Sequence, residues 1–434
     1  MNPSLSLSRR RFLRTAATAA VAPTLLPAHV WGAEVGPNDT IRLGFIGVGT
    51  QGRGLLGNCL NRKEVAVLAV ADVDSTRRAN ARRIVEEHYA KATGAGSPKV
   101  CQEYTDFRDL LARPDIDAVV IATPDHWHAL IGILAAKAGK DIYCEKPLTE
   151  SIREARELVN AVRKHRRVFQ VGSMQRSSRE FRRACQLVRN GALGKIQEIH
   201  VAVGGPGRWC DLPAEAMEPG LDWNLWLGPA PWREYHSELS PRGVHKHFPN
   251  WRNYREYGGG MVTDWGAHHF DIAQWGLGMD ESGPVDVIPP TEPNAQSGVQ
   301  FRYADGTVMI HKPGNGVTFK GTDGQIYVNR GKFESTPESL VEIPLESHKI
   351  QLYESNDHIG NWLQCIRTRK RPICDVEVGA RTVTVCHLAN LAYWNGKTLK
   401  WDAAKEEFVG GFGDNAWKDR LYRAPWTLDA IVKA

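Results

Sequence analysis

The sequence predicts an α/β Rossmann domain with a doubly wound parallel sheet, followed by an α+β domain with an open, largely antiparallel sheet. Strand-like and helix-like runs alternate up to residue 172, and β-branched alternating runs joined by turn residues follow it. The chain of 434 residues also exceeds the roughly 250 to 300 residues at which one hydrophobic core stops growing. We therefore expect two domains, over residues 39–172 and 173–434.

The first domain contains short apolar runs with the length of buried strands, separated by longer runs with helical patterns. The expected strands cover residues 41–46, 65–71, 118–122, 141–144 and 168–171, in a sheet of about six strands. One expected helix follows the first strand as far as Leu60, and others cover residues 77–89, 129–138 and 152–165. Such alternation places helices on both faces of a parallel sheet.

The second domain is expected to be built from hairpins and two late helices. Alternating runs cover residues 197–203, 299–303, 307–312, 316–320 and 324–328, and turn pairs such as Asp305-Gly306 join some of them. Helical patterns follow at 358–369 and 378–394. Between these parts lies an irregular stretch, 204–259, rich in Trp, Pro and Gly. Long structured loops of this kind are often functional, so we expect a lid.

The first 33 residues have the pattern of a twin-arginine (Tat) secretion signal. Arg9, Arg10, Arg11 and Arg14 precede an Ala-rich stretch that is shorter than the roughly 20 apolar residues of a membrane span and contains prolines. We therefore expect no stable membrane span, and export by the Tat machinery to a periplasmic or other extracytoplasmic location.

The composition also constrains the expected partners and the expected state of the cysteines. Without the four arginines of the signal, the formal net charge falls from +6 to +2, which gives no electrostatic reason to expect nucleic acid as a partner. The eight cysteines are scattered, without the close pairs typical of metal sites. Because Tat cargo folds in the reducing cytoplasm, we expect mostly free, buried thiols.

A glycine-rich turn after the first expected strand predicts a dinucleotide site. Gly47, Gly49 and Gly52 have the GxGxxG spacing, in which the glycines permit a tight turn, close approach of a pyrophosphate and close helix packing. The second expected strand ends in Asp72, about twenty residues later, where a carboxylate can accept both ribose hydroxyls. Since Asp72 would repel a 2′-phosphate, we expect NAD, with NADP less favoured.

Three further motifs fall where chemistry is expected. Residues 123–128 read Thr-Pro-Asp-His-Trp-His after one strand, and Glu145-Lys146-Pro147 follows the next. Open α/β sheets bind ligands outside these strand ends. The third motif holds Asp264 and His268, four residues apart and so expected on one helix face, where a carboxylate could raise the basicity of an imidazole.

In this order, the motifs Thr-Pro-x-x-x-His, Glu-Lys-Pro and Asp-x-Gly-x-His resemble the Gfo/Idh/MocA oxidoreductases over residues 40 to 400. The resemblance implies hydride transfer from a carbinol carbon of a sugar or sugar derivative to NAD. It implies that Lys146 bonds a substrate hydroxyl, that His268 removes its proton and that Asp264 orients His268 or relays its proton. It also implies an open sheet that forms homodimers or homotetramers.

The same resemblance and the glycine-rich turn suggest which residues border the cofactor. The expected cofactor contacts are Gly47, Gly49, Thr50, Gln51, Gly52, Asp72, Thr123, Pro124, His128, Glu145 and Lys146, with Gln175 and Arg176 bordering the site. A carbohydrate substrate is favoured in addition by seven tryptophans in or beside the long loop and the Asp264 helix, because indole rings suit a sugar ring. These are Trp209, Trp223, Trp226, Trp232, Trp251, Trp265 and Trp275.

Export favours a second activity, because NAD is not replenished outside the cytoplasm and must be regenerated in place. Some exported members of the family are redox-neutral glycosidases that pass through a ketosugar, and His245 and His247 could supply extra acid or base groups. Two weaker alternatives remain open: a binding protein without turnover, and a metal hydrolase. The hydrolase would use His126, His128, Asp264, His268 and His269. We favour no metal, since the Rossmann pattern explains these positions better.

Overall fold

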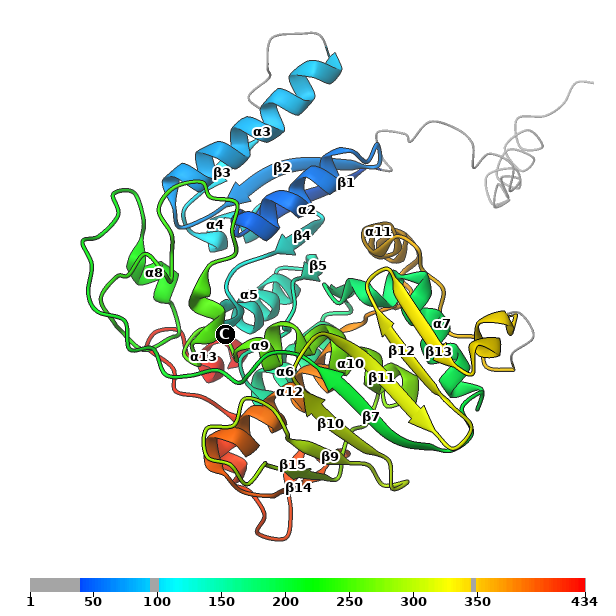
Figure 1. The fold of residues 1–434 in the computed structure, drawn as a ribbon. Helices are drawn as coiled ribbons and strands as arrows, with labels where there is room; N and C mark the ends of the chain where they lie inside the picture. Colours follow the sequence, from blue (N-terminus) through cyan, green and yellow to red (C-terminus); the bar gives the residue numbers. More distant parts are fainter. Residues whose placement is uncertain (1–39, 94–100, 345–348, 434) are drawn as a thin grey trace, which may run out of the picture. The chain divides into compact units, whose positions relative to one another are not determined.

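The first sheet of the computed structural model has six parallel strands in the order β3-β2-β1-β4-β5-β6 (Figure 1). The structure describes residues 40–93, 101–344 and 349–433, so the expected export signal lies outside the described residues. The strands are β1 (Ile41–Ile46), β2 (Val65–Ala71), β3 (Gln102–Tyr104), β4 (Ala118–Ile121), β5 (Asp141–Cys144) and β6 (Phe169–Val171). Every residue of β4 is buried, as in a sheet covered on both faces.

Helices follow the strands as expected for a doubly wound sheet. They are α2 (Thr50–Leu60), α3 (Ser75–Thr93), α4 (Phe107–Leu111), α5 (Asp125–Lys137) and α6 (Ile152–Lys164). The strand order reverses at β1, which pairs with β2 on one side and β4 on the other. Ligands bind such sheets in the crevice at this switch point. The edge strand β3 was not predicted individually, because its three residues, Gln-Glu-Tyr, have no apolar pattern.

The second sheet has nine strands in the order β13-β12-β11-β7-β10-β9-β8-β14-β15. Among the described strands of this second sheet, only β7 and β10 pair in parallel, which confirms the largely antiparallel sheet. The strands are β7 (Ile196–Ala202), β8 (Asp286–Ile288), β9 (Gln300–Arg302), β10 (Val308–Lys312), β11 (Gly316–Gly321), β12 (Gln325–Asn329), β13 (Lys332–Thr336), β14 (Leu399–Asp402) and β15 (Glu407–Phe408).

Three helices form the core of this domain with the sheet. These are α7 (Arg179–Arg189), α10 (Gly266–Leu277) and α12 (Val376–Asn395), and α10 contacts both other helices and the strands β7 and β11. Burial alternates along β10 and β12, so one face of each strand packs on the core. Helix α11 (His358–Thr368) returns instead to the first sheet, where Trp362 packs in one cluster with Phe45 and Tyr143.

The long segment 204–259 has a small hydrophobic core of its own. It contains the short helices α8 (Trp223–Leu227) and η4 (Asn250–Asn253), and Trp223 stacks on Trp226 with ring centroids 4.6 Å apart. Its buried cluster joins these rings with Trp251, Tyr254 and Tyr257, among others. The segment is therefore a packed cap, and most of its tryptophans are explained by this packing.

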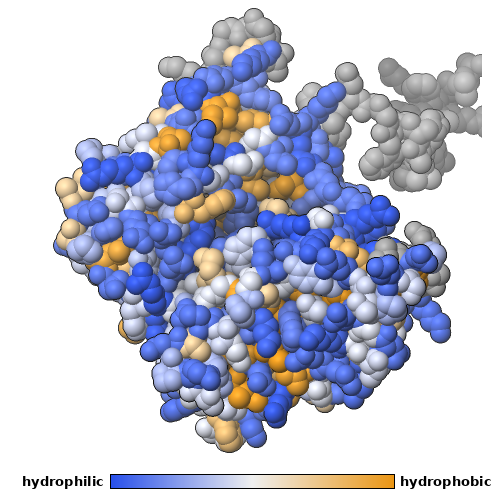
Figure 2. All heavy atoms as spheres, viewed as in Figure 1, coloured by the Kyte–Doolittle hydropathy of each residue, from blue (hydrophilic) through white to orange (hydrophobic). Residues whose placement is uncertain are grey.

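Cysteines and surface agree with a packed globular chain. Seven of the eight cysteines are buried as free thiols, and Cys210 is half-buried. Hydrophilic side chains cover most of the face in Figure 2, with apolar residues in separate groups. Among the described helices, none has the length and apolar character that crossing a membrane requires.

Candidate active site

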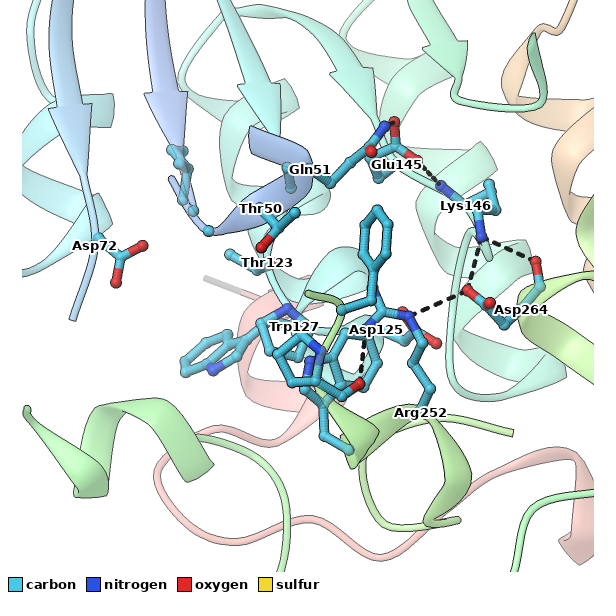
Figure 3. A pocket seen from close by; sticks show the side chains of 18 of the residues that line it. Thr50, Gln51, Asp72, Thr123, Asp125, Trp127, Glu145, Lys146, Arg252 and Asp264 are labelled. Carbon is cyan, nitrogen blue, oxygen red and sulfur yellow. Dashed lines mark hydrogen bonds and ion pairs between the residues drawn. The ribbon is translucent and has the colours of Figure 1, made fainter. Parts of the chain in front are cut away.

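A cavity of about 480 Å³ opens at the switch point of the first sheet. Its walls come from the carboxyl ends of β1, β2, β4 and β5, from the cap and from the start of α10. Eleven of the predicted site residues line it: Gly47, Gly49, Thr50, Gln51, Asp72, Thr123, Pro124, Glu145, Lys146, Asp264 and His268. In Figure 3, Asp72 lies at one end of the group of labelled residues, and Lys146 and Asp264 lie at the other.

The glycine-rich turn forms a cradle that side chains would obstruct. Gly47 has φ +83°, and an added Cβ would lie 2.7 Å from the backbone of Ala122. A Cβ on Gly52 would lie 2.1 Å from the carbonyl oxygen of Gly47. At Gly49 a Cβ would meet nothing within 4 Å, so open space lies in front of the N-terminus of α2. Unpaired amides facing open space suit a pyrophosphate.

Asp72 is held firmly at the end of β2. Its Oδ2 accepts from the amide of Val48 at 2.8 Å, and its Oδ1 accepts from the amide of Asp74 at 3.0 Å. Burial raises the pKa of Asp72, and the charge of Arg77 and these two amides oppose that effect. Each oxygen keeps a lone pair for a ribose hydroxyl. Together with the buried, unpartnered Oγ1 of Thr123, the turn and Asp72 fit a dinucleotide.

One segment of the cap, the strap (residues 240–248), lies beside the cavity. Arg77 of α3 donates to Ser240 Oγ and to the Gly243 carbonyl, both at 3.3 Å, and to the Pro241 carbonyl. Thr50 Oγ1 donates to the His247 carbonyl at 2.9 Å, and Arg53 donates to the His245 carbonyl. The strap also lines the cavity through His245 and Phe248. The strap is thus bonded to α2, which begins in the glycine-rich turn, and to α3, which follows Asp72.

At the other end of the cavity, Lys146 and Asp264 form an ion pair. Lys146 Nζ lies 2.7 Å from Asp264 Oδ1 and 3.0 Å from its carbonyl oxygen, and Arg252 Nε lies 3.4 Å from the same Oδ1 (Figure 3). Burial would raise the pKa of Asp264, but Lys146 and Arg252 hold it below its ordinary value. The carboxylate is therefore ionised, and it fixes the position of the ammonium.

His268 is a buried imidazole at the same end. Its Nδ1 has no hydrogen-bond partner in the described part of the chain. Burial, and then the charges of Lys146 and Arg330, lower the pKa of His268 well below its ordinary value of 6.5. With its amide in the orientation that satisfies both ends, Gln175 donates to the His268 carbonyl at 3.1 Å. The imidazole is thus neutral near pH 7 and can accept a proton.

The expected partnership of Asp264 with His268 is not found. No hydrogen bond or ion pair joins them within the described ranges; Asp264 contacts Lys146 and Arg252 instead. The helix is divided here, since α9 (Met261–Asp264) ends at Asp264 and α10 begins at Gly266. Two cations from other elements outcompete a neutral imidazole as partners for a buried carboxylate.

Three other predicted contacts lie behind the cavity wall. The His128 ring nitrogens lie 2.8 Å from the Pro147 carbonyl and 3.0 Å from the Thr123 carbonyl, so His128 joins the two loops without lining the cavity. Arg176 is buried between Asp271 and Asp280, with Nε 2.8 Å from Asp271 Oδ2 and Nη2 2.7 Å from Asp280 Oδ1. Arg176 is therefore structural, and His128 and Gln175 position other groups.

In the described residues, His126 and His128 belong to no group of side chains that could hold a metal ion. His126 Nε2 lies 3.0 Å from the Trp226 carbonyl, and burial lowers the pKa of His126 to about 3. His269 Nε2 lies 2.6 Å from Asn315 Oδ1. In the part of the chain that the structure describes, no three His, Cys, Asp or Glu side chains are arranged to hold a metal ion.

Sequence reasoning missed four charged residues that line the cavity: Arg77, Asp125, Arg252 and Arg330. Asp125 stands inside the Thr-Pro-x-x-x-His motif, so its place directly after a strand could have indicated it. Arg252 comes from the cap and Arg330 from the turn between β12 and β13, and no sequence pattern marks either. Burial raises the pKa of Asp125 well above its ordinary value.

This fold and crevice define a dinucleotide-binding oxidoreductase. Residues 41–173 match the family model described as "Oxidoreductase family, NAD-binding Rossmann fold", and residues 180–428 match "Oxidoreductase family, C-terminal alpha/beta domain". The chain belongs to the Gfo/Idh/MocA oxidoreductase family, with an NAD-binding Rossmann domain.

Individual relatives are distant. A glycosyl hydrolase family 109 protein of Shewanella pealeana is 29% identical over 225 residues, 47% of this chain and 48% of that protein. The chain spans about half the length of the curated relatives it matches. The fold is shared with aldose-aldose oxidoreductase from Caulobacter crescentus (TM-score 0.57, 17% identity, 83% of this chain and 99% of that one). It is also shared with the WlbA dehydrogenase from Bordetella pertussis in complex with NADH and UDP-GlcNAcA (TM-score 0.59, 18% identity, 84% and 98%).

Proposed function

We propose that this protein is an exported NAD-dependent oxidoreductase that oxidises a carbinol carbon of a sugar or sugar derivative. The observation that carries the proposal is the placement of Lys146, fixed by Asp264, and neutral His268 at the end of the cavity opposite Asp72. Relatives with sugar-directed names, such as the aldose-aldose oxidoreductase, support a carbohydrate substrate.

Each group has a role that its surroundings support. His268, which lines the cavity and is neutral, takes the proton of the substrate hydroxyl. Lys146 stabilises the negative charge that develops on that oxygen, and Asp264 holds the ammonium in position. The bound nicotinamide supplies the hydride acceptor, so the substrate leaves as a ketone.

NAD is favoured over NADP by the surroundings of Asp72. Arg77 and Arg53 lie nearby, but their guanidinium groups already bond strap carbonyls, Arg77 also pairs with Asp74, and Arg53 also bonds the Val48 carbonyl. A 2′-phosphate would therefore meet the carboxylate of Asp72 without a free arginine to balance it. Structures of the WlbA dehydrogenases contain NADH, in line with this preference.

The strap supports a cofactor that stays bound between turnovers. Replacing Arg77 by methionine keeps the aliphatic stem but removes the bonds to Ser240, Pro241 and Gly243. We expect NAD to dissociate roughly 10-fold faster or more, since bonds to a charged group contribute about 1.5–3 kcal/mol. Rapid dilution with a competing nucleotide measures this rate. Arg83→Met, at an exposed ion pair with Glu87 on the same helix, is the control and should leave the rate unchanged.

The pH dependence of the reaction should report the lowered pKa of His268. Only the neutral imidazole accepts a proton, and its pKa lies well below 6.5, so kcat/KM should not fall as pH decreases from 7.5 to 6.5. We expect kcat/KM to fall only at more acidic pH, where His268 becomes protonated. Single-turnover reduction of bound NAD, followed by absorbance across this range, measures the profile. A half-maximal rate at or above pH 6.5 would contradict the assigned base.

A second function is favoured by the glycosyl hydrolase family 109 relatives and by the expected export. In that redox-neutral route, oxidation at a ring carbon acidifies the neighbouring C–H, the glycosidic substituent is eliminated, water adds, and the hydride returns to the sugar. The buried carboxyl of Asp125, favoured in its protonated form, would be placed to donate a proton in such a cycle.

Product analysis decides between the two functions. The holoprotein is mixed with a panel of sugars and their aryl glycosides, and NADH, ketosugar and released aglycone are measured. Net NADH or ketosugar supports the dehydrogenase, whereas aglycone without net redox change supports the glycosidase. If bound NAD is never reduced and no product forms with any of them, both proposals fail.

Export through the Tat pathway and a homo-oligomeric state belong to the same proposal. The arginine-rich start of the sequence supports export, and the open nine-stranded sheet offers a face on which copies could associate. Fractionation of cells that express the full chain, and size measurement of the purified protein, test these two points.

A further inference from the structure

Three cationic side chains lie at the substrate end of the cavity. Lys146, Arg252 and Arg330 all line it. Asp264 is shared by the first two, at 2.7 Å from Lys146 and 3.4 Å from Arg252. Arg330 has no carboxylate within ion-pair distance in the described part of the chain.

The two other carboxyls nearby form no ion pair with Arg330 in the described part of the chain. Glu145 accepts from Gln51 Nε2 at 2.8 Å and from the Lys146 amide at 3.2 Å, and it forms no ion pair with Arg330. Asp125 is 2% exposed and its Oδ2 has no partner in the described ranges. Burial raises the pKa of both groups. Oxidised nicotinamide, where it binds, would add a further positive charge.

Arg330 is an exposed residue whose guanidinium has contacts at Nε and on one face. It occupies the turn between β12 and β13, where its amide donates to Asn329 Oδ1 at 2.8 Å. Its guanidinium lies over the Trp265 ring, 4.8 Å from the centroid, and its Nε donates to Gln175 at 3.2 Å. Nη1 and Nη2 have no partner among the described residues. Stacking on Trp265 and the hydrogen bond at Nε thus fix the plane of the guanidinium. They leave its outer edge, formed by Nη1 and Nη2, unoccupied.

We infer that the substrate is an acidic sugar, whose carboxylate is bound by the outer edge of the Arg330 guanidinium beside His268 and Lys146. The planar fork of arginine matches a carboxylate through two parallel hydrogen bonds, and its weak hydration lowers the cost of partial burial. This inference rests on the proposed sugar oxidoreductase and adds the chemical class of its substrate.

The test uses the holoprotein and matched pairs of sugars that differ only in the carboxylate: glucuronate with glucose, and galacturonate with galactose. Reduction of bound NAD and calorimetric binding are both measured, at low and high salt. We expect the acidic member of a pair to have a roughly 10- to 100-fold higher kcat/KM or affinity, and this preference to weaken with added salt.

Arg330→Gln should remove most of that preference. Lys332→Gln is the matched control, because it removes a positive charge from the same hairpin at an exposed position outside the cavity. Lys332→Gln should keep the preference, which separates direct contact from the long-range field. Salt-sensitive binding that is lost in Arg330→Gln supports the inference even where no hydride moves.

Two outcomes would overturn the inference. If neutral sugars reduce bound NAD as well as or better than acidic ones, the acidic class is wrong but the proposed oxidoreductase stands. If acidic sugars neither bind nor react in any pair, Arg330 does not bind a substrate carboxylate. The same conclusion follows if Arg330→Gln leaves the preference for acidic sugars intact. Failure of every sugar, acidic or neutral, to reduce NAD, with no glycoside cleaved, would instead refute the proposed function.

Discussion

Lys146→Ala should lower the rate of bound-NAD reduction roughly 10²- to 10³-fold while NAD remains bound. The expected loss is large because Lys146 is the cation held at the cavity end by Asp264, and removing a preorganised charge from a developing oxyanion costs this order of rate. NAD should remain because the ammonium of Lys146 bonds Asp264, whereas Asp72, which lies at the opposite end of the labelled residues in Figure 3, and the glycine-rich turn are expected to hold the nucleotide.

The measurement combines single-turnover reduction of NAD with the nucleotide content of the purified variant. Lys164→Ala, at an exposed position on α6 of the same domain, is the control and should behave like the wild type. Turnover that survives in Lys146→Ala would refute the role assigned to the ammonium. Loss of bound NAD in this variant would instead place Lys146 in cofactor retention.

Gly52→Ala should weaken NAD binding roughly 10- to 100-fold and destabilise the protein by about 1–3 kcal/mol. The added Cβ would lie 2.1 Å from the Gly47 carbonyl oxygen, so the turn and the start of α2 must separate. That movement displaces the amides that face the pyrophosphate position. Equilibrium binding of NAD to protein stripped of nucleotide, together with thermal unfolding, measures both effects.

Gly54→Ala is a matched control on the same helix. A Cβ there would meet nothing within 4 Å, and alanine is preferred over glycine inside a helix by about 0.5–1 kcal/mol. We therefore expect normal NAD binding and slightly higher stability. Equal loss of binding in both variants would show that helix propensity, and not the close contact with Gly47, determines the site.

Local patterns predicted the parallel sheet of the first domain and a group of candidate cofactor residues that line one cavity. The turn at Gly47 to Gly52, the strand that leads to Asp72 and the position of Lys146 after β5 depend on neighbouring residues and on a rule that parallel strands share one carboxyl edge. These features were placed in one cavity by the structure. The two predicted domains are not fully separated at residue 172, because α11, from the second of them, packs on the first sheet through Trp362.

The error at Asp264 shows where local reasoning stops. A spacing of four residues places two side chains on one helix face, but it does not say which cations other elements bring nearby. Lys146 arrives from β5 and Arg252 from the cap, more than one hundred residues and about ten residues away along the chain, respectively. Because an ionised, buried carboxylate is most stable beside cations, Asp264 pairs with them and not with His268.

The sequence by itself determined the nucleotide half of this protein, because a phosphate cradle is built from consecutive residues whose spacing is directly visible. Only the tertiary structure decided the substrate half, through the sharing of Asp264 by two cations and the stacking of Arg330 on Trp265, and it also placed the strap on α2 and α3. Charges are balanced through space and not along the chain. Which cation is left without a partner is therefore known only once all the packed elements are in place.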